Sequence, residues 1–209
     1  MPTHTVEQGE QLSGIAEQFG FQSIDTIWNH PNNAELKKLR KDPHILFPGD
    51  QVFIPDKTDK SDSAPTTKLS TFTINIQLLL LNLKLQDING DPVASKPVTI
   101  SVEGTVVPPP ATDGAGKTSS VILKSSKNAS LVLGDLQFPL KIGHLDPIDK
   151  QSGQIARLNN LGYEAGDTET VDAEAFQSAV EEFQCDNKLP VNGVCDGTTQ
   201  GKLKDVHGC

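Results

Sequence analysis

Aromatic residues and long apolar runs are scarce in this chain of 209 residues. It has one Trp and one Tyr, and hydrophobic residues make up 35% of it, below the roughly 45–50% of an average globular domain. The longest apolar run, Leu78 to Leu81, is far too short to span a membrane. Because small domains bury a lower fraction of their surface, this composition favours several small cores over a single large one.

Positive charge is also in short supply. The chain has 18 Lys and Arg residues and 27 Asp and Glu residues, which gives a net charge of −9. This acidic balance argues against nucleic acid or an anionic membrane as a partner. Basic and acidic residues number 4 and 8 in residues 1–56, 9 and 7 in 57–142, and 5 and 12 in 143–209. Since the net charge changes sign twice, we expect three domains, at residues 1–56, 71–145 and 146–209, with 57–70 as a polar linker.

Residues 3–55 predict a small unit in which two strands enclose two helices. Residues 4–6 are expected to form the first strand. Residues 12–19 carry apolar side chains at i, i+3, i+4 and i+7, as one face of a helix requires. Ser23 is a suitable N-cap for a second helix that includes Trp28, and residues 51–55 form a closing strand that stops at proline.

The opening HTVEQGEQLSGIAEQFGF and the ending LFPGDQVFIP of this unit resemble a LysM domain. Glu10-Gln11 replaces the usual Asp-Thr, and the polar stretch Asn29 to Pro43 is longer than usual. LysM domains bind N-acetylglucosamine-containing glycans, such as peptidoglycan or chitin-like polymers, between the loop after the first strand and the loop before the second. The resemblance implies glycan contacts from Gly9, Glu10, Gln11, Leu12, Ile45, Leu46, Phe47, Pro48 and Gly49. The same residues equally fit a purely structural role in two turns, and the altered loop and long insert leave room for a protein ligand.

The middle of the chain predicts an antiparallel β-sandwich. Residues 72–80 alternate with period two, and the phase then shifts to Leu81, Leu83 and Leu85, which indicates a bulge or a strand that changes sheet. Further short strands are expected at 98–102, 121–123, 131–133 and 140–142, with turns at Asn89-Gly90 and within TDGAGK. The segments DINGDPV and TDGAGK resemble the carboxypeptidase-regulatory or prealbumin-like class of Ig-like sandwiches. With no Cys and no His before His144, this part is interpreted as a spacer or interaction scaffold.

The C-terminal residues predict three helices. The first includes Ile155 and Leu158 and ends at Gly162, the second is capped by Asp172, and the third opens at Thr198 or Thr199. The segments IARLNNLGY, AVEEFQ and LPVNGVCDGTTQGKL are similar to the three-helix peptidoglycan-binding domain often appended to cell-wall hydrolases, although ETVDAEAF replaces its central Asp-Gly loop. The similarity implies a glycan or stem-peptide site at Tyr163, Gln184, Asn192 and Asp196, whereas the helical spacing of Phe183 indicates a core position.

Three cysteines, Cys185, Cys195 and Cys209, all lie in this last part of the chain. They allow one disulfide and one free thiol. We expect the bridge between Cys185 and Cys195, because an intervening helix would hold Cys195 and Cys209 too far apart. A bridge between Cys185, at the end of the second helix, and Cys209 is the rival pairing. A zinc site of three Cys and His207 is a further alternative. Otherwise no cofactor or metal is expected.

These parts together favour a non-catalytic protein with peptidoglycan-binding modules at both ends. No segment remains for a separate catalytic domain, and the adjacent carboxylates of Glu181 and Glu182 point apart on their helix. The alternative is an adaptor that binds a protein, because LKIGHLDPIDKQSGQIARLNNLGYEAG and KLKDVHGC resemble LysM proteins encoded beside type VI secretion spike genes. That resemblance implies a spike or effector partner. The opening MPTHTVEQGE lacks the features of a secretory signal peptide, so we expect cytoplasmic synthesis and delivery to the periplasm or outside by a specialised system.

Overall fold

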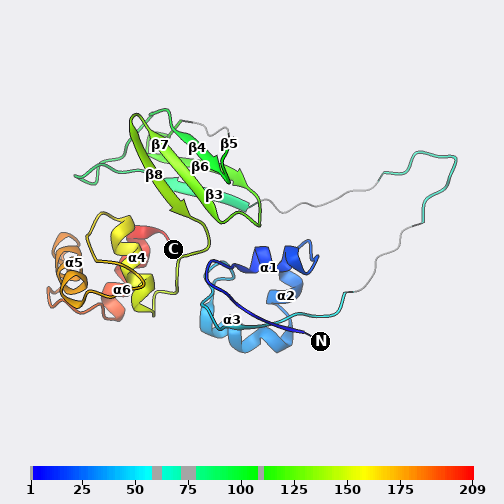
Figure 1. Cartoon of the computed structure of the whole chain (residues 1–209), viewed down its shortest axis with the longest axis horizontal. Helices are drawn as coiled ribbons and strands as arrows, with labels where there is room; N and C mark the ends of the chain where they lie inside the picture. The colour runs from blue at the N-terminus through cyan, green and yellow to red at the C-terminus, as the bar shows by residue number, and fades with distance from the viewer. Residues whose placement is uncertain (1, 58–62, 72–78, 108–110) are drawn as a thin grey trace.

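The computed structural model describes residues 2–57, 63–71, 79–107 and 111–209. Helices and antiparallel sheets are both present, as expected, and they form an N-terminal unit, a central pair of sheets and a C-terminal helical unit. The N- and C-terminal units lie side by side below the two sheets in Figure 1. Residues 63–71 lie away from all three units in Figure 1.

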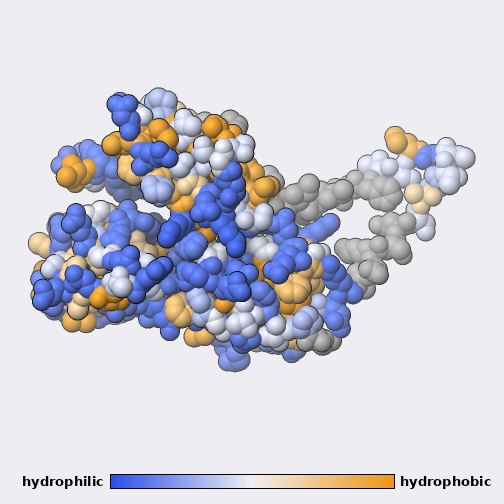
Figure 2. Space-filling model, viewed as in Figure 1, coloured by the Kyte–Doolittle hydropathy of each residue, from blue (hydrophilic) through white to orange (hydrophobic). Residues whose placement is uncertain are grey.

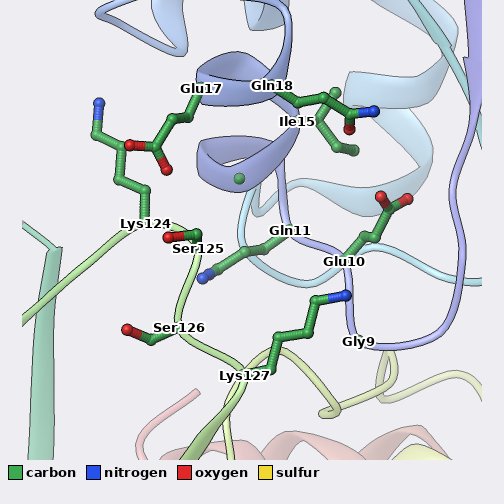
Figure 3. Close-up of a pocket in the computed structure, with 11 residues that line it drawn as sticks. Gly9, Glu10, Gln11, Ile15, Glu17, Gln18, Lys124, Ser125, Ser126 and Lys127 are labelled. Carbon is green, nitrogen blue, oxygen red and sulfur yellow. The ribbon is translucent and has the colours of Figure 1, made fainter. Parts of the chain in front are cut away.

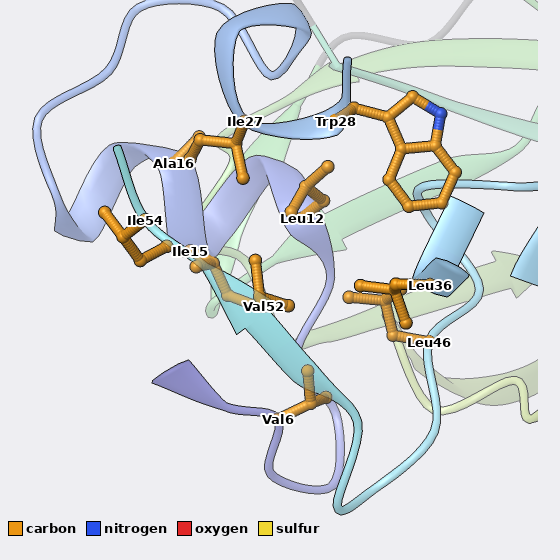
Figure 4. Close-up of a cluster of buried hydrophobic side chains, with 10 residues drawn as sticks. All are labelled: Val6, Leu12, Ile15, Ala16, Ile27, Trp28, Leu36, Leu46, Val52 and Ile54. Carbon is orange, nitrogen blue, oxygen red and sulfur yellow. The ribbon is translucent and has the colours of Figure 1, made fainter. Parts of the chain in front are cut away.

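The N-terminal unit has two short strands with helices between them. In chain order these are β1 (Thr3–Thr5), α1 (Leu12–Gln18), α2 (Asp25–Trp28), the 3₁₀ turn η1 (Pro31–Asn33), α3 (Ala34–Arg40) and β2 (Gln51–Phe53). The strands pair antiparallel with His4 opposite Val52. Figure 4 shows the side chains that fill the space between them, namely Val6, Leu12, Ile15, Ala16, Ile27, Trp28, Leu36, Leu46, Val52 and Ile54.

Helix α3 is an addition to the expected order of elements. It lies within the stretch 29–43, in which the sequence has too few apolar residues to show a helical period. Leu36 is its one buried residue, and the other leucine, Leu39, is 59% exposed. Tertiary packing of Leu36 against the core therefore stabilises a helix that the apolar pattern does not indicate.

The central residues form two antiparallel sheets around one shared core. One sheet pairs β3 (Leu79–Lys84) with β6 (Lys117–Ile122), and the other has the order β5 (Thr105–Val107), β4 (Thr99–Val102), β7 (Asn128–Leu133) and β8 (Leu136–Lys141). Both sheets contribute to the buried cluster that contains Ile100, Ile122 and Leu131. Residues 72–78 of the expected first strand lie outside the described residues. Leu81, Leu83 and Leu85, the expected positions after the shift of phase, pack against the shared core.

Strand β6 faces the other way from what its apolar residues suggest. The sequence marks Val121 and Leu123 as its apolar positions, yet they are 50% and 70% exposed. Pairing with β3 places Ser120 opposite Leu81 and Ile122 opposite Leu79, and both of these β6 residues are buried. Inter-strand register thus overrides the local apolar pattern here, because a shift of one residue would turn every side chain of the strand over.

The C-terminal unit consists of the three expected helices, α4 (Gln151–Asn160), α5 (Ala173–Asp186) and α6 (Gly197–His207). Gly162 follows α4 with a φ of 92°, and Asp172 caps α5 by accepting hydrogen bonds from the amides of Glu174 and Ala175. The expected start of α6 at a threonine is wrong, because Asp196 is the cap. The buried core comprises Ile155, Leu158, Ala165, Ala179, Val180, Phe183 and Leu203.

No helix in the described ranges is long and apolar enough to cross a bilayer. On the face seen in Figure 2, both helical units are mainly hydrophilic, and hydrophobic side chains gather over the central sheets. Exposed apolar residues of these sheets are Leu80, Val106, Val121, Leu136 and Phe138.

Asn33 generates a prediction about the N-terminal unit. Its buried side-chain amide donates to the carbonyls of Ile27 and Phe53 and accepts from the amide of Phe53, each at 2.8 Å. Asn33→Ala leaves these groups unpaired and should reduce the free energy of unfolding by about 3 kcal/mol. Urea unfolding followed by fluorescence of Trp28, the chain's one Trp, measures this unit directly. The matched Asn32→Ala, at an exposed neighbour, should change stability by less than about 0.5 kcal/mol, and equal effects of the two variants would contradict the assignment.

Candidate functional site

The loop between α5 and α6 is built around the side chain of Gln184, which is 1% exposed. Its Nε2 lies 2.9–3.0 Å from three acceptors, the Asn192 side chain, the Val194 carbonyl and the Thr199 hydroxyl. Its Oε1 accepts from the backbone amides of Asn192 and Gly193. One buried amide therefore fixes the path of this loop over the end of α5.

The same loop presents two apolar side chains to the outside. Val191 and Val194 are 57% and 58% exposed and flank Asn192 and Gly193, the residues that Gln184 holds. Gly193 has a φ of 69°, and a Cβ there would lie 2.6–2.7 Å from the Gln177 and Glu181 side chains of α5. The loop thus packs closely on the helix with its valines directed away from the core.

Two other residues of the expected site also make internal contacts. Asn192 Oδ1 accepts from the amide of Val194, and Asp196 Oδ1 accepts from the amide of Thr199 as the cap of α6. Hydrogen bonding at the start of α6, chiefly from the Thr199 amide, lowers the pKa of Asp196. Both residues are exposed and shape the loop that carries them.

Tyr163 lies against α5. Its ring packs edge-on against Phe183 at a centroid distance of 5.6 Å, and its hydroxyl donates to Asp186 at 3.1 Å. Burial, followed by this hydrogen bond, raises the pKa of Tyr163 to about 12. Phe183 is fully buried, as its helical spacing predicts.

The structure therefore divides the four expected contact residues of this unit into two groups. Gln184 is enclosed by the groups that it binds, so its expected role as a direct glycan contact is replaced by one of positioning. Tyr163, Asn192 and Asp196 keep part of their surface accessible and remain predictions as contacts. The exposed valines of the loop were not predicted, because an isolated Val in a turn carries no sequence signal.

Arg157 is a second buried polar residue that the sequence did not single out. It is 1% exposed, and its guanidinium donates to the carbonyls of Asp146, Gly153 and Cys209 at 2.7–2.9 Å. Burial disfavours the charged form and lowers the pKa of Arg157. These bonds join α4 to the segment before it and to Cys209, two residues after the end of α6.

The three cysteines are free thiols in the structure, so the expected bridge between Cys185 and Cys195 is not formed. Cys185 is exposed on α5, whereas Cys195 packs against the helical core. Burial raises the pKa of Cys195 to about 11. Cys209 Sγ lies 3.2 Å from His207 Nδ1, but no group of three metal-ligating side chains occurs among the residues that the structure describes, so the zinc alternative has no site there.

The two expected glycan-binding loops of the N-terminal unit lie close together but are largely internal. The amide of Gly49 donates to the carbonyl of Val6, and the amide of Leu12 donates to that of Pro43. Leu12 and Leu46 are 0% and 4% exposed and belong to the core, which corrects their expected role as contacts. Glu10 binds His4 at 2.7 Å and accepts from the amide of Glu7.

The chain itself covers part of these loops. A Cβ on the buried Gly9 would lie 2.6 Å from His144 Nε2, and one on Gly143 would lie 2.5 Å from the carbonyl oxygen of Gly9. Gly9 is therefore inaccessible to a glycan, contrary to expectation, because the segment after β8 lies on it.

The second loop meets the beginning of the C-terminal unit. Lys150 Nζ lies 5.2 Å from the centre of the Phe47 ring, and Arg40 packs on that ring at 5.6 Å. Arg40 also binds Asp50 through two hydrogen bonds of 2.7 and 2.8 Å, which raise the pKa of Arg40. Ile45 and Pro48 are half-buried, and of the nine expected loop residues Gly49 is the most open.

Comparison with known proteins identifies one of these units. Residues 156–203 match the family model described as "Putative peptidoglycan binding domain". The matched residues include the second half of α4, all of α5, the loop held by Gln184 and α6 as far as Leu203. The chain thus contains a peptidoglycan-binding domain at its C-terminal unit. No curated protein and no solved structure matches the chain.

The hydrogen bonds of Gln184 give a testable expectation. Gln184→Ala removes the groups that satisfy the loop amides and should lower the stability of the C-terminal unit by about 2–4 kcal/mol. Hydrogen exchange should show faster exchange at the amides of Asn192 and Gly193. Gln151→Ala, at an exposed glutamine of α4, is the matched control and should leave these rates unchanged. Unaltered exchange in Gln184→Ala would show that the loop does not depend on this side chain.

His207 gives a pH dependence. Burial, and secondarily the nearby Arg157, lowers the pKa of His207 to about 4, whereas the unfolded chain titrates near 6.5. Between these values the unfolded state binds more protons, so stability should fall as pH decreases through this window. Calorimetry should show a falling unfolding temperature from about pH 7 to about pH 5, with a shallower slope for His207→Gln. Because the pKa of His144 is also lowered by burial, the slope should decrease without vanishing, and identical slopes would contradict the assignment.

Proposed function

We propose that the chain is a non-catalytic protein that binds bacterial peptidoglycan through its C-terminal unit. The observation that supports this most directly is the loop of residues 189–196, which the peptidoglycan-binding domain holds rigidly and from which Val191 and Val194 project. Apolar side chains can cover the face of a sugar ring while nearby backbone groups bond its acetamido substituents. Tyr163 and Asn192 are the polar residues that we assign to the edge of this surface.

A binding role rather than catalysis is favoured by the chemistry of the groups near the loop. Gln184 and Arg157 are engaged in internal hydrogen bonds, and Asp196 caps a helix. Burial raises the pKa of the Cys195 thiol to about 11, which opposes the thiolate form that a nucleophile requires. These residues support a rigid surface and offer no arrangement of nucleophile and base.

We further propose that the N-terminal unit is a LysM-type module and that the central sheets form an Ig-like sandwich. The order of strand, helices and strand in residues 2–57 and the shared core of the two sheets support these assignments. Since the two end units contact each other, the chain presents them as one surface to a repetitive polymer, where a second weak site adds avidity. A wall-binding role places its action outside the cytoplasm.

A second candidate is an adaptor that binds a protein, such as a component of a contractile secretion apparatus. The observation that favours it is the covering of the N-terminal loops by residues 143–150, which reduces their access to glycan. Leu80 and Val121, paired across β3 and β6 with half of each side chain exposed, provide an apolar surface for such a contact.

Binding to insoluble sacculi separates the two candidates. In a pull-down with the full chain, Val191→Asp combined with Val194→Asp should reduce retention about tenfold or more, because charge replaces the apolar contact, equivalent to roughly 1.4 kcal/mol or more. Val171→Asp is the matched control, since Val171 is 48% exposed in the same unit but outside the loop, and it should bind as the wild type does.

Failure of the wild-type chain to bind sacculi would overturn the proposed function and favour the adaptor. If the loop variant and the wild-type chain are retained equally on sacculi, binding occurs elsewhere on the molecule.

A further inference from the structure

A cleft of about 390 Å³ lies between the N-terminal unit and the central sheets. One wall is formed by residues 9–18, at the start and along the side of α1, and the other by the loop 124–127 between β6 and β7. None of residues 45–49 lines it. The cleft is therefore distinct from the groove between the two N-terminal loops that the sequence resemblance implies.

Contacts on both sides fix the two walls against each other. Lys124 Nζ donates to the carbonyl of Gln22 at 2.7 Å, which joins the loop to the chain after α1. A Cβ on Gly14 would lie 3.3 Å from the carbonyl oxygen of Lys124, so this helix approaches the loop closely. The approach of Gly9 to Gly143 closes the other end. The opening between the two units is thus bounded by direct contacts.

Two buried polar side chains in this cleft lack a partner. Gln11 is 7% exposed, and Figure 3 shows its amide directed across the cleft toward Ser125. Ser126 is also a lining residue and is 4% exposed, but Figure 3 shows its hydroxyl directed away from Gln11. Neither side chain has a hydrogen-bond partner among the described residues. The Gln11 amide is unpaired and keeps part of its surface accessible in the cleft, so it is suited to bonding a ligand.

Charges of opposite sign are placed on the two walls. Glu17 extends from α1 toward the loop, and Lys127 extends from the loop toward Gly9 (Figure 3). Neither charged side chain has an ion-pair partner among the described residues. A ligand that carries both an ammonium and a carboxylate would satisfy the two residues together, and the Gln11 amide could share the carboxylate.

The lining also argues against a sugar as the occupant. Among the described residues, no aromatic side chain lines the cleft, and Ile15 is the one large apolar side chain there. Sugar sites generally offer an apolar face for the ring, whereas a neutral sugar would leave the two opposite charges unsatisfied.

We propose that this cleft binds the peptide part of the bacterial wall, through a residue that has a free α-ammonium and α-carboxylate group. The ligand class rests on the proposed wall-binding function, and the site itself rests on the cleft geometry. Glu17 takes the ammonium group, and Lys127 and the Gln11 amide take the carboxylate.

Titration of the full chain with meso-diaminopimelic acid, an amino acid of wall peptides that carries both groups, tests this site. Amide chemical shifts of Gln11, Ser125 and Ser126 should change saturably. Pimelic acid, which lacks the ammonium groups, and 1,5-diaminopentane, which lacks the carboxylates, should each bind at least tenfold more weakly. Equal binding of pimelic acid would indicate a simple anion site and overturn the proposal, as would the absence of saturable shifts.

Paired variants locate the binding and separate this proposal from the previous one. Glu17→Gln and Lys127→Gln should each weaken diaminopimelic acid binding at least tenfold, whereas Glu169→Gln and Lys84→Gln, at exposed positions outside the cleft, should stay within twofold. Unchanged affinity in the first pair overturns the assignment. The double variant Val191→Asp, Val194→Asp should bind diaminopimelic acid as the wild type does but should show reduced retention on sacculi. The two proposed sites can therefore be tested independently of each other.

Discussion

The arrangement of the whole chain depends on the close approach of two glycine backbones. Gly9 and Gly143 both have positive φ values, 83° and 79°, and a Cβ on Gly143 would meet the carbonyl oxygen of Gly9 at 2.5 Å. A side chain at position 143 would therefore require both a strained backbone and separation of the two segments. This contact brings the end of β8 onto the loop before α1.

Several features of the molecule follow from that contact. The segment after Gly143 continues along the N-terminal unit, where Lys150 reaches the ring of Phe47 and Asp149 lies 3.9 Å from Arg40. The contact between Gly9 and Gly143 also brings α1 beside the β6–β7 loop, where the cleft lies between them. The backbone contact between Gly9 and Gly143 thus covers the expected glycan-binding loop and contributes to the cleft beside α1.

Buried polar side chains connect separate segments within each of the two helical units. Asn33 connects α2 and β2 in one unit, and Gln184 and Arg157 connect loops to helices in the other. Each is a polar residue that an apolar pattern does not mark as part of the core, yet each is 1–2% exposed. Such groups must be bonded internally once they are buried, which gives rigidity to short connections that have no regular structure.

Local sequence determined much of the secondary structure: the helix of residues 12–18, the helix capped by Asp172, the turn at Gly162 and the short antiparallel strands. The spacing of apolar residues, the capping side chains and the glycine positions determine structure within a few residues of themselves, so these elements can be predicted from the sequence. The peptidoglycan-binding domain at 156–203 was recognisable for the same reason. Helix α3, the outward face of Val121, the burial of Gln184 and the covering of Gly9 were decided by tertiary structure. Each depends on a neighbour outside the local apolar pattern, such as the loop at 192–199 for Gln184, strand β3 for Val121 and Gly143 for Gly9. Such contacts leave no periodic trace in the sequence.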